Sequence, residues 1–417
     1  MLIEFSATNY RSIRDTQTLS MAASKYYTDL AGGNCMDTAV AGLPRLLRSA
    51  VIYGPNAAGK SNLLKALAFM QNFVLLSHAH QEGALINVVP FALAEATRNQ
   101  PATFECFFIQ DSIRYQFGFA VNRERVTHEW LFVFPEGKAQ RWYERSFDET
   151  SGKEEWYFGS KFGGRRQVWR DATRKNALFL SAAIQLNNEQ LKPVFNWFQH
   201  RLAILPGGDI NISFTINQCE TEAGRQRVME FMNAADIGIA GIDLKKNAIT
   251  HESLPHELPL PIREQIMRDG AHQVLLQHTT ESGELCAFDL MDESNGTRQL
   301  FLYAGSLLDV LEKGRVFFVD ELDTSLHPLM VRFLIGLIQN PSINRHNAQL
   351  IFTTHDTSVL DTDIFRRDQV WFVEKDTHQA SRLYPLSDFS PRKHEALEKG
   401  YLQGRYGALP YIGEMRF

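Results

Sequence analysis

The sequence of 417 residues predicts an α/β fold, in which a mixed sheet is accompanied by an antiparallel β subdomain and an α-helical insertion. Three observations lead to this prediction. A glycine-rich loop at 54–61 lies between an apolar run at 49–53 and a stretch with helical spacing. Two more apolar runs, at 315–319 and 349–354, read as buried parallel strands. Residues 103–144 alternate in the manner of successive hairpins, which predicts antiparallel strands.

The glycine-rich loop matches the pattern G-x-x-x-x-G-K-[ST] in full and has the strand and helix on either side that this motif requires. Its N–H groups and the helix N-terminus would face phosphate oxygens. Lys60 would add positive charge at the β- and γ-phosphates, and the Ser61 hydroxyl would bind Mg²⁺. The alternative, a chance glycine-rich turn, does not account for these flanks. The motif predicts a nucleoside triphosphate site formed by Gly54, Asn56, Ala57, Ala58, Gly59, Lys60, Ser61 and Asn62.

The apolar run at 315–319 ends in Asp320 and Glu321. Burying two acids is costly unless they serve a cation or a reaction, although they could instead cap the next turn. Beside a bound Mg·phosphate, Asp320 would hold the metal through water and Glu321 would orient or deprotonate an attacking water. The run at 349–354 ends in His355, whose neutral imidazole would donate to the γ-phosphate; the alternative is a structural histidine.

Two further signals are weak alone. Ser294 and Gly296 precede a helical stretch, where they offer a ligand a hydroxyl, a close approach and free N–H groups, but Ser-x-Gly before a helix is common.

Residues 161–175 contain six basic residues and one acid, and the spacing predicts Arg166, Arg170 and Arg174 on one helix face. Either a solvated surface or a contact for nucleic acid or an acidic partner fits this stretch.

The composition bounds the class of protein. Hydrophobic residues make up 44% and charged residues 22%, as is ordinary for a soluble folded chain. A net charge of −5 argues against a chain that coats nucleic acid. The four cysteines form no C-x-x-C pair, the N-terminus lacks the features of a signal peptide, and no apolar run reaches the ~20 residues that span a bilayer. We therefore expect a cytoplasmic protein with no membrane partner.

The remaining segments complete the expected organisation. Residues 2–13 and 17–21 read as a hairpin, 24–44 as loop, 84–93 as an edge strand or loop, and 220–272 as helical with a proline-rich break. The expected domains are residues 1–92 and 286–417 for the two halves of the nucleotide-binding core, 93–160 for the antiparallel subdomain and 161–285 for the mainly helical insertion.

The order of these motifs resembles the ABC-type ATPase heads of the SMC and RecF class, and more narrowly the OLD-like and RloA-type AAA-family ATPases of bacteria. The resemblance covers residues 9–12, 54–61, 294–326, 353–356 and 400–410, and the middle of the chain matches only in general character. Two departures stand out. Thr297 occupies a signature position usually held by Gln or Glu, and none of Gln71, Gln81 and Gln100 is a convincing Q-loop glutamine.

The resemblance implies an ABC-type head that pairs head to tail, as a homodimer or within a higher oligomer, and encloses two ATP molecules. Lys60, Ser61, Asp320, Glu321 and His355 would act from one copy. Ser294, Gly296, Thr297 and Asp323 would reach the nucleotide from the other copy. Arg11 would also approach the phosphates.

The resemblance also implies the kind of function. No heptad run could build the long coiled coil of SMC proteins. Only about 60 residues follow His355, and they close with aromatic and basic positions, so we do not expect the Toprim nuclease domain of OLD proteins. We expect an ATPase, with ATP and Mg²⁺ as cofactors, that controls a separate nuclease or Toprim-type effector encoded nearby in bacterial anti-phage defence. A RecF-like DNA-repair ATPase that binds DNA and a regulatory sensor with negligible turnover are the alternatives.

Overall fold

The computed structural model describes residues 1–205, 212–247, 271–392 and 395–410. The chain divides into two compact units. The first unit comprises Met1–Gly208, Val310–Asp323 and Leu334–Phe417, and the second comprises Asp209–Asp309 and Thr324–Phe333. No helix in the described part of the chain is both long and apolar enough to cross a membrane.

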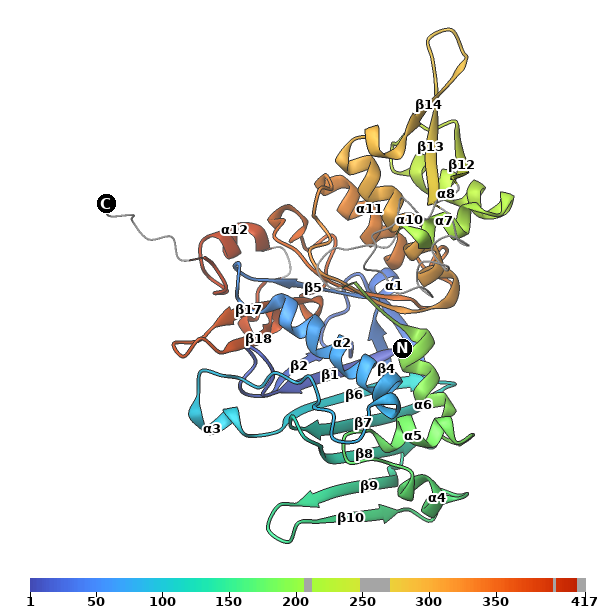
Figure 1. Cartoon of the computed structure of the whole chain (residues 1–417). Helices are drawn as coiled ribbons and strands as arrows, with labels where there is room; N and C mark the ends of the chain where they lie inside the picture. Colours follow the sequence, from blue (N-terminus) through green and yellow to red (C-terminus); the bar gives the residue numbers. More distant parts are fainter. Residues whose placement is uncertain (206–211, 248–270, 393–394, 411–417) are drawn as a thin grey trace, which may run out of the picture. The chain divides into compact units, whose positions relative to one another are not determined.

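A six-stranded mixed sheet forms one half of the first unit (Figure 1). Its strand order is β11(Leu202–Leu205), β15(Val316–Val319), β16(Gln349–Thr353), β5(Ser49–Tyr53), β17(Val370–Lys375) and β18(Ser381–Pro385). The first five strands are parallel and β18 is antiparallel. Every residue of β5, β15 and β16 is buried, which explains their uninterrupted apolar sequences. The predicted strands at these three places are confirmed.

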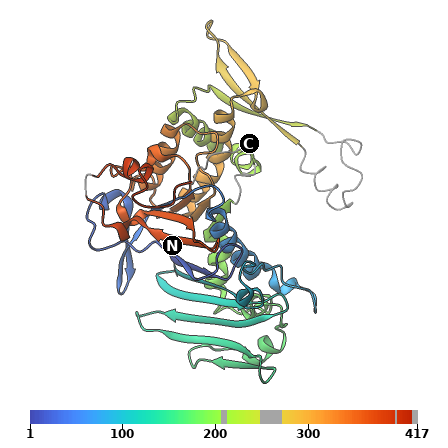
Figure 2. The same ribbon diagram turned by 90° about the vertical axis from the view of Figure 1, so that its left-hand side faces the viewer.

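A seven-stranded antiparallel sheet forms the other half of the first unit (Figure 1; Figure 2). Its order is β10(Lys153–Phe158), β9(Gln140–Asp148), β8(Val126–Phe134), β7(Ile113–Val121), β6(Ala102–Gln110), β1(Leu2–Thr8) and β2(Gln17–Ser20). Both the N-terminal hairpin and the series of hairpins predicted from alternating residues are confirmed. Together with the six-stranded sheet, they confirm the predicted α/β class.

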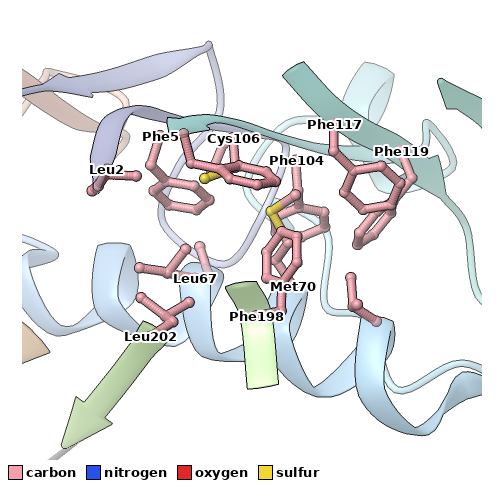
Figure 3. Packing of buried hydrophobic residues seen from close by; sticks show 14 of the residues in the cluster. Leu2, Phe5, Leu67, Met70, Phe104, Cys106, Phe117, Phe119, Phe198 and Leu202 are labelled. Carbon is pink, nitrogen blue, oxygen red and sulfur yellow. The ribbon is translucent and has the colours of Figure 1, made fainter. Parts of the chain in front are cut away.

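The long helix α2(Lys60–Leu76) packs against strands of both sheets, namely β1, β6 and β11. Figure 3 shows Leu67 and Met70 of this helix facing Phe5, Phe104 and Cys106 of the antiparallel sheet. The side chains of all five residues are fully buried. This core fixes the helix that begins at the glycine-rich loop, because burial of each large apolar side chain stabilises the fold by roughly 1.5–3 kcal/mol.

Two loop predictions had different outcomes. The interval 24–44 is not all loop, because β3(Cys35–Val40) pairs with β4(Leu43–Leu47) across a turn at Gly42 and follows the short helix α1(Ala31–Asn34). The buried Met36 and Leu46 pair across the two strands. Residues 84–93 form no strand, as the loop alternative predicted, and α3(Glu95–Arg98) follows.

Short helices flank strands β6–β10 along the chain. The helix η1(Ser77–Ala79) comes before these strands, and α4(Arg166–Asp171), α5(Phe179–Gln185), α6(Lys192–Asn196) and η2(Trp197–Arg201) come after them. The prediction of three arginines on one helix face is wrong. α4 ends at Asp171, so Arg174 lies beyond it, where its guanidinium donates to the backbone carbonyl of His80. Elements η6(Thr357–Val359), η7(Arg367–Gln369), η8(Leu386–Phe389) and α12(Leu397–Leu402) lie near the C-terminus.

The second unit contains α7(Ser213–Cys219), α8(Glu222–Ala234), η5(Leu290–Asp292) and the three-stranded sheet β12(Gly241–Asn247), β13(Ala271–Thr279), β14(Leu285–Asp289). It also contains the first parts of α10(Asn295–Lys313) and α11(Pro328–Gln339). The helical prediction for 220–272 holds for α8 and is wrong for β12. Antiparallel pairing of the buried Ile242 with the buried Leu276 outweighs the local helical pattern. The predicted proline-rich break at 254–261 lies outside the described residues.

Candidate active site

The glycine-rich loop leaves β5 after Tyr53 and runs into α2 at Lys60. Gly59, the residue before the helix, has φ 112°, a left-handed conformation that L side chains rarely adopt. A Cβ atom at this position would lie 2.0 Å from Oγ of Ser381. Ala57 also has positive φ, at 62°. The second glycine of the motif is therefore required both by backbone conformation and by the close approach of β18.

A cavity of about 280 Å³ opens over the loop, and we call it the P-loop pocket. It brings the predicted loop residues together with the predicted ends of β15 and β16, because these strands and β5 are parallel neighbours whose carboxyl ends meet at one edge. The P-loop pocket is lined by Asn56, Ala57, Ala58, Gly59, Lys60, Ser61, Asn62, Glu321 and His355.

Lys60 is a buried cation at the base of the P-loop pocket. Its Nζ donates to the carbonyl oxygens of Gly54, at 2.7 Å, and Pro55, at 3.2 Å. Burial lowers the pKa of Lys60 below its ordinary 10.5, while the negative charges of Glu321 and Asp320 oppose this shift. The lysine is thus held by its own loop and electrostatically coupled to both acids at the end of β15.

The two acids occupy different environments. Asp320 is 4% exposed, and its Oδ1 accepts a hydrogen bond of 2.7 Å from the Thr353 hydroxyl. The side chain of Glu321 is 52% exposed and its backbone has φ 53°, so the chain turns sharply after the strand. Asp320 is therefore a buried, hydrogen-bonded carboxylate, and Glu321 is a half-exposed acid that lines the P-loop pocket. The metal-binding role of Asp320 stays a prediction.

His355 lies opposite Glu321, with 3.8 Å between its Nε2 and Oε1 of the acid. Its backbone N–H donates to Oδ2 of Asp323, at 3.2 Å. Burial and the positive charge of Lys60 lower the pKa of His355 below the ordinary 6.5. The imidazole is consequently neutral at pH 7 and can donate from one nitrogen. Asp323 reaches the site within its own chain, through the backbone at His355.

Ser12 and Ser381 brace the loop from outside it. The Ser12 hydroxyl accepts from Nδ2 of Asn62, at 2.7 Å, and from the Ser381 hydroxyl, at 2.7 Å. The Ser381 hydroxyl also contacts the carbonyl of Ala58, at 2.6 Å. No sequence motif points to Ser381. Ser12 belongs to the N-terminal segment of the resemblance, but its contact with Asn62 is visible only in the fold.

Arg11 is exposed and donates from Nε to the Tyr10 hydroxyl, at 3.2 Å. Among the described residues it is not one of those that line the P-loop pocket. Gln71 donates to the carbonyl oxygens of Phe198 and Leu202, at 2.7 and 2.9 Å, which ties α2 to β11. Gln71 therefore has a structural role, and the contact of Arg11 with phosphate stays a prediction.

Ser294 lies in the second unit, at the start of α10. Its Oγ accepts from the Thr297 N–H, at 3.1 Å, and lies 2.9 Å from the Thr297 hydroxyl, so Ser294 caps the helix. Thr297 is buried, and a Cβ at Gly296 would make only ordinary contact with the carbonyl of Ser325. The role of these residues toward a nucleotide on another copy stays a prediction.

The residues at the P-loop pocket fit an Mg²⁺–phosphate group. Mg²⁺ is bound in proteins through one or two oxygen side chains together with phosphates and waters. Ser61, which lines the P-loop pocket, would supply one such oxygen beside a helix N-terminus and the buried ammonium group of Lys60. Asp320, which is not among the described lining residues but interacts electrostatically with Lys60, would supply another. Within the described ranges, no group of three or more His, Cys, Asp or Glu is arranged to hold a metal ion without such phosphates.

Comparisons with solved structures return SMC heads. A head bound to the C-winged helix domain of ScpA is 13% identical, with 92% of this chain and 97% of that chain covered and a TM-score of 0.43. The SMC head domain from Thermotoga maritima is 14% identical, with 92% and 98% covered and a TM-score of 0.41. At these scores neither supports a functional conclusion. No curated protein matches the chain.

Residues 49–361 match a family described as "AAA domain, putative AbiEii toxin, Type IV TA system". The match covers about three quarters of the chain and includes the glycine-rich loop, the acids after β15 and His355. This chain therefore belongs to that family of AAA domains.

Proposed function

We propose that this protein is a cytoplasmic, Mg²⁺-dependent ATPase whose nucleotide state joins and separates two copies and so controls a separate effector in bacterial anti-phage defence. The observation that carries the ATPase assignment is the P-loop pocket, where Lys60 and Ser61 share one cavity with Glu321 and His355. Binding of the nucleotide alone would need only the glycine-rich loop. A water-accessible acid and a neutral imidazole facing the same cavity are what hydrolysis needs.

The residues divide the chemistry among them. The loop N–H groups and Lys60 would hold the triphosphate, and Ser61 with Asp320 would hold Mg²⁺, which supplies neutralisation of phosphate charge when bound. Glu321 would accept a proton from the attacking water, and His355 would donate to the γ-phosphate. Positioning and charge stabilisation provide most of the catalysis in phosphoryl transfer, so these fixed groups account for turnover.

The proposal of paired copies rests on the motif order of the ABC-type resemblance. Ser294 and Gly296 at the start of α10 would contact the nucleotide of the other copy, and the γ-phosphate would then bridge two surfaces. The family description, which names a putative toxin of a toxin–antitoxin system, supports a role in defence. The finer likeness to RloA-type and OLD-like ATPases supports a nuclease or Toprim-type effector encoded nearby.

Light scattering with and without ATP tests the pairing. We expect the Glu321→Gln variant to double its mass in Mg·ATP and to remain single in ADP. Adding Ser294→Asp to the Glu321→Gln variant should abolish this doubling. Asp still caps the helix, but its negative charge would repel the phosphates of the nucleotide bound to the other copy. Ser294→Thr, which keeps both the cap and the neutral hydroxyl, is the matched control. Doubling that is equal in all these variants would refute the assigned role of Ser294.

A DNA-binding ATPase of the RecF kind is the second candidate. It is favoured by one observation, a run of exposed basic side chains beside α4 with a single exposed acid, Asp171. These basic residues are Lys161, Arg165, Arg170, Arg174 and Lys175. The net charge of −5 for the whole chain weighs against it.

A further inference from the structure

Thr353 is the last residue of β16 and has no exposed surface. Its strand is the parallel neighbour of β15, which ends next to the two acids. The Thr353 hydroxyl donates to Oδ1 of Asp320 and accepts from the backbone N–H of Glu321, each at 2.7 Å. One buried hydroxyl thus contacts both consecutive acids of the site.

The directions of these two hydrogen bonds require a hydroxyl. A threonine oxygen carries one hydrogen and can accept hydrogen bonds as well, so it satisfies a carboxylate and an N–H together. Valine has nearly the same shape but can do neither, and would leave the backbone N–H of Glu321 and the buried Asp320 carboxylate without this partner. The backbone carbonyl of Thr353 also accepts from the Leu322 N–H, at 3.1 Å.

The contact acts where the backbone is strained. Glu321 has φ 53°, and the left-handed region costs a non-glycine residue roughly 1–2 kcal/mol. The backbone N–H groups of Glu321 and Leu322 donate to the hydroxyl and carbonyl oxygens of Thr353, and these hydrogen bonds hold the turn in place. The turn directs the Glu321 side chain into the P-loop pocket, where it faces His355.

We infer that Thr353 is a positioning residue that fixes Asp320 for Mg²⁺ and Glu321 for the attacking water at the same time. This inference rests on the proposed ATPase function. Thr353 does not line the P-loop pocket among the described residues, so it acts through the two acids and not by contact with substrate. A threonine that only packed the core would affect stability and leave the metal requirement unchanged.

The test compares Thr353→Val, which keeps the shape, with Thr353→Ser, which keeps the hydroxyl. Thr353→Cys, a weak hydrogen-bonding group, replaces the valine variant if that variant does not fold. Ser49→Ala is the matched control for stability, because it removes a buried hydroxyl from the opposite end of the same sheet, where Gln369 and Gln339 donate to it.

The first readout is binding of a fluorescent ATP analogue while Mg²⁺ is titrated, which requires no turnover. We expect Thr353→Val to bind the analogue in EDTA as the parent does, but to need about tenfold more Mg²⁺ for half-saturation, because Asp320 loses a hydrogen bond to a charged group. The second readout is phosphate release, where kcat should fall about tenfold or more while KM for Mg·ATP changes less than about threefold.

Thr353→Ser and Ser49→Ala should stay within about threefold of the parent in both readouts. If Thr353→Val needed the same Mg²⁺ concentration for half-saturation as the parent and kept the parental kcat, the inference would be overturned and the proposed ATPase function would stay intact. A parent protein without Mg²⁺-dependent binding of the analogue would instead contradict the proposed function, and the inference would fall with it.

Discussion

Lys60, Glu321 and His355 form one set of mutually dependent charges. The pKa of Lys60 is lowered by burial, and the nearby acids counteract that effect. The same lysine disfavours a second positive charge at His355. The pKa values of Lys60 and His355 therefore depend on the charges around them, and a substitution at Glu321 should change both.

Glu321→Gln should reduce phosphate release by about 10²–10⁴-fold, since the amide cannot accept a proton from water. Binding of ATP should remain, because Lys60 and the loop are unchanged. Single-turnover phosphate release measures the effect, and Glu136→Gln, in an exposed turn of the antiparallel sheet, is the control. Hydrolysis at the parental rate would show that Glu321 does not activate the water.

The lowered pKa of His355 predicts that ATP hydrolysis is sensitive to acid. This pKa lies below 6.5, so the imidazole is neutral at pH 7 and gains a proton only in more acidic solution. The imidazolium would pair with the Glu321 carboxylate 3.8 Å away and so draw that carboxylate from the attacking water. We expect phosphate release to fall as the pH drops from 7 to about 5.5, and to fall less in His355→Asn, which cannot titrate. If phosphate release by the parent and by His355→Asn fell equally between pH 7 and about 5.5, the role assigned to His355 would be contradicted.

The residue types of this set were predictable from sequence, because a strand that ends in Asp-Glu or in His beside a phosphate loop is a local pattern. Thr353 was not predictable as a functional residue. It reads as one more β-branched residue in an apolar strand, and its role depends on the strand beside it.

At the scale of elements, the loop depends on two segments far from it in the chain. Ser12 lies in the turn after β1, and Ser381 begins β18, yet their hydroxyls meet beside the loop. The order β5, β17, β18 brings Ser381 there, and its backbone N–H donates to the carbonyl of Ser12, at 2.7 Å.

Gly59→Ala should abolish nucleotide binding. Its Cβ would overlap the Ser381 hydroxyl, and its φ of 112° is unfavourable for alanine in any case. Removing the clash with a second change, Ser381→Gly, should therefore restore little. Equilibrium binding of labelled ATP measures this, with Gly238→Ala as the control, since a Cβ there meets nothing within 4 Å. Parental affinity in Gly59→Ala would refute the requirement for glycine.

Glu129 joins the antiparallel sheet to α5. This fully buried carboxylate accepts from the N–H groups of Phe179 and Leu180, at 2.8 and 3.0 Å, and pairs with buried Arg145, at 3.1 Å. Glu129→Gln should lower the free energy of unfolding by at least about 2 kcal/mol, because Arg145 keeps its charge without the compensating carboxylate. Denaturant titration measures the loss, with exposed Glu155→Gln as the control. Equal denaturation midpoints for the parent protein and Glu129→Gln would contradict this prediction.

Element predictions succeeded where one face or both faces of a segment are buried. The antiparallel strands alternate and the parallel strands are wholly apolar, so each pattern identifies its environment. Prediction failed for β12, where the partner strand lies beyond a long interval of sequence, and for β3 and β4, whose short pattern is interrupted by polar residues.

At the scale of the whole molecule, the charge distribution separates the two candidate functions. The chain carries a net charge of −5, and residues 161–175 present five exposed basic side chains with one exposed acid. In the RecF-like alternative, this stretch would bind duplex DNA, because counterion release by lysine and arginine provides most non-specific affinity.

We expect the protein to show no duplex DNA binding at about 150 mM salt, and charge reversal of Arg165, Arg170 and Lys175 to leave ATP hydrolysis unchanged. Fluorescence anisotropy over a salt series measures this. Reversal of Arg45, Lys138 and Lys399 is the control, since these residues lie elsewhere in the chain. DNA binding that is lost only in the first variant, with a salt slope reduced by about one per residue, would favour the RecF-like function.

The sequence by itself determined the candidate chemistry of this protein: a phosphate loop, two acids that we propose for metal and water, and an imidazole, each encoded in a stretch of a few residues. The tertiary structure decided what holds them. Ser12 meets Ser381, and Thr353 meets Asp320, only because strands from distant parts of the chain become neighbours in one sheet. Hydrogen bonds between such segments leave no local pattern, since any serine or threonine can serve once the fold has placed it.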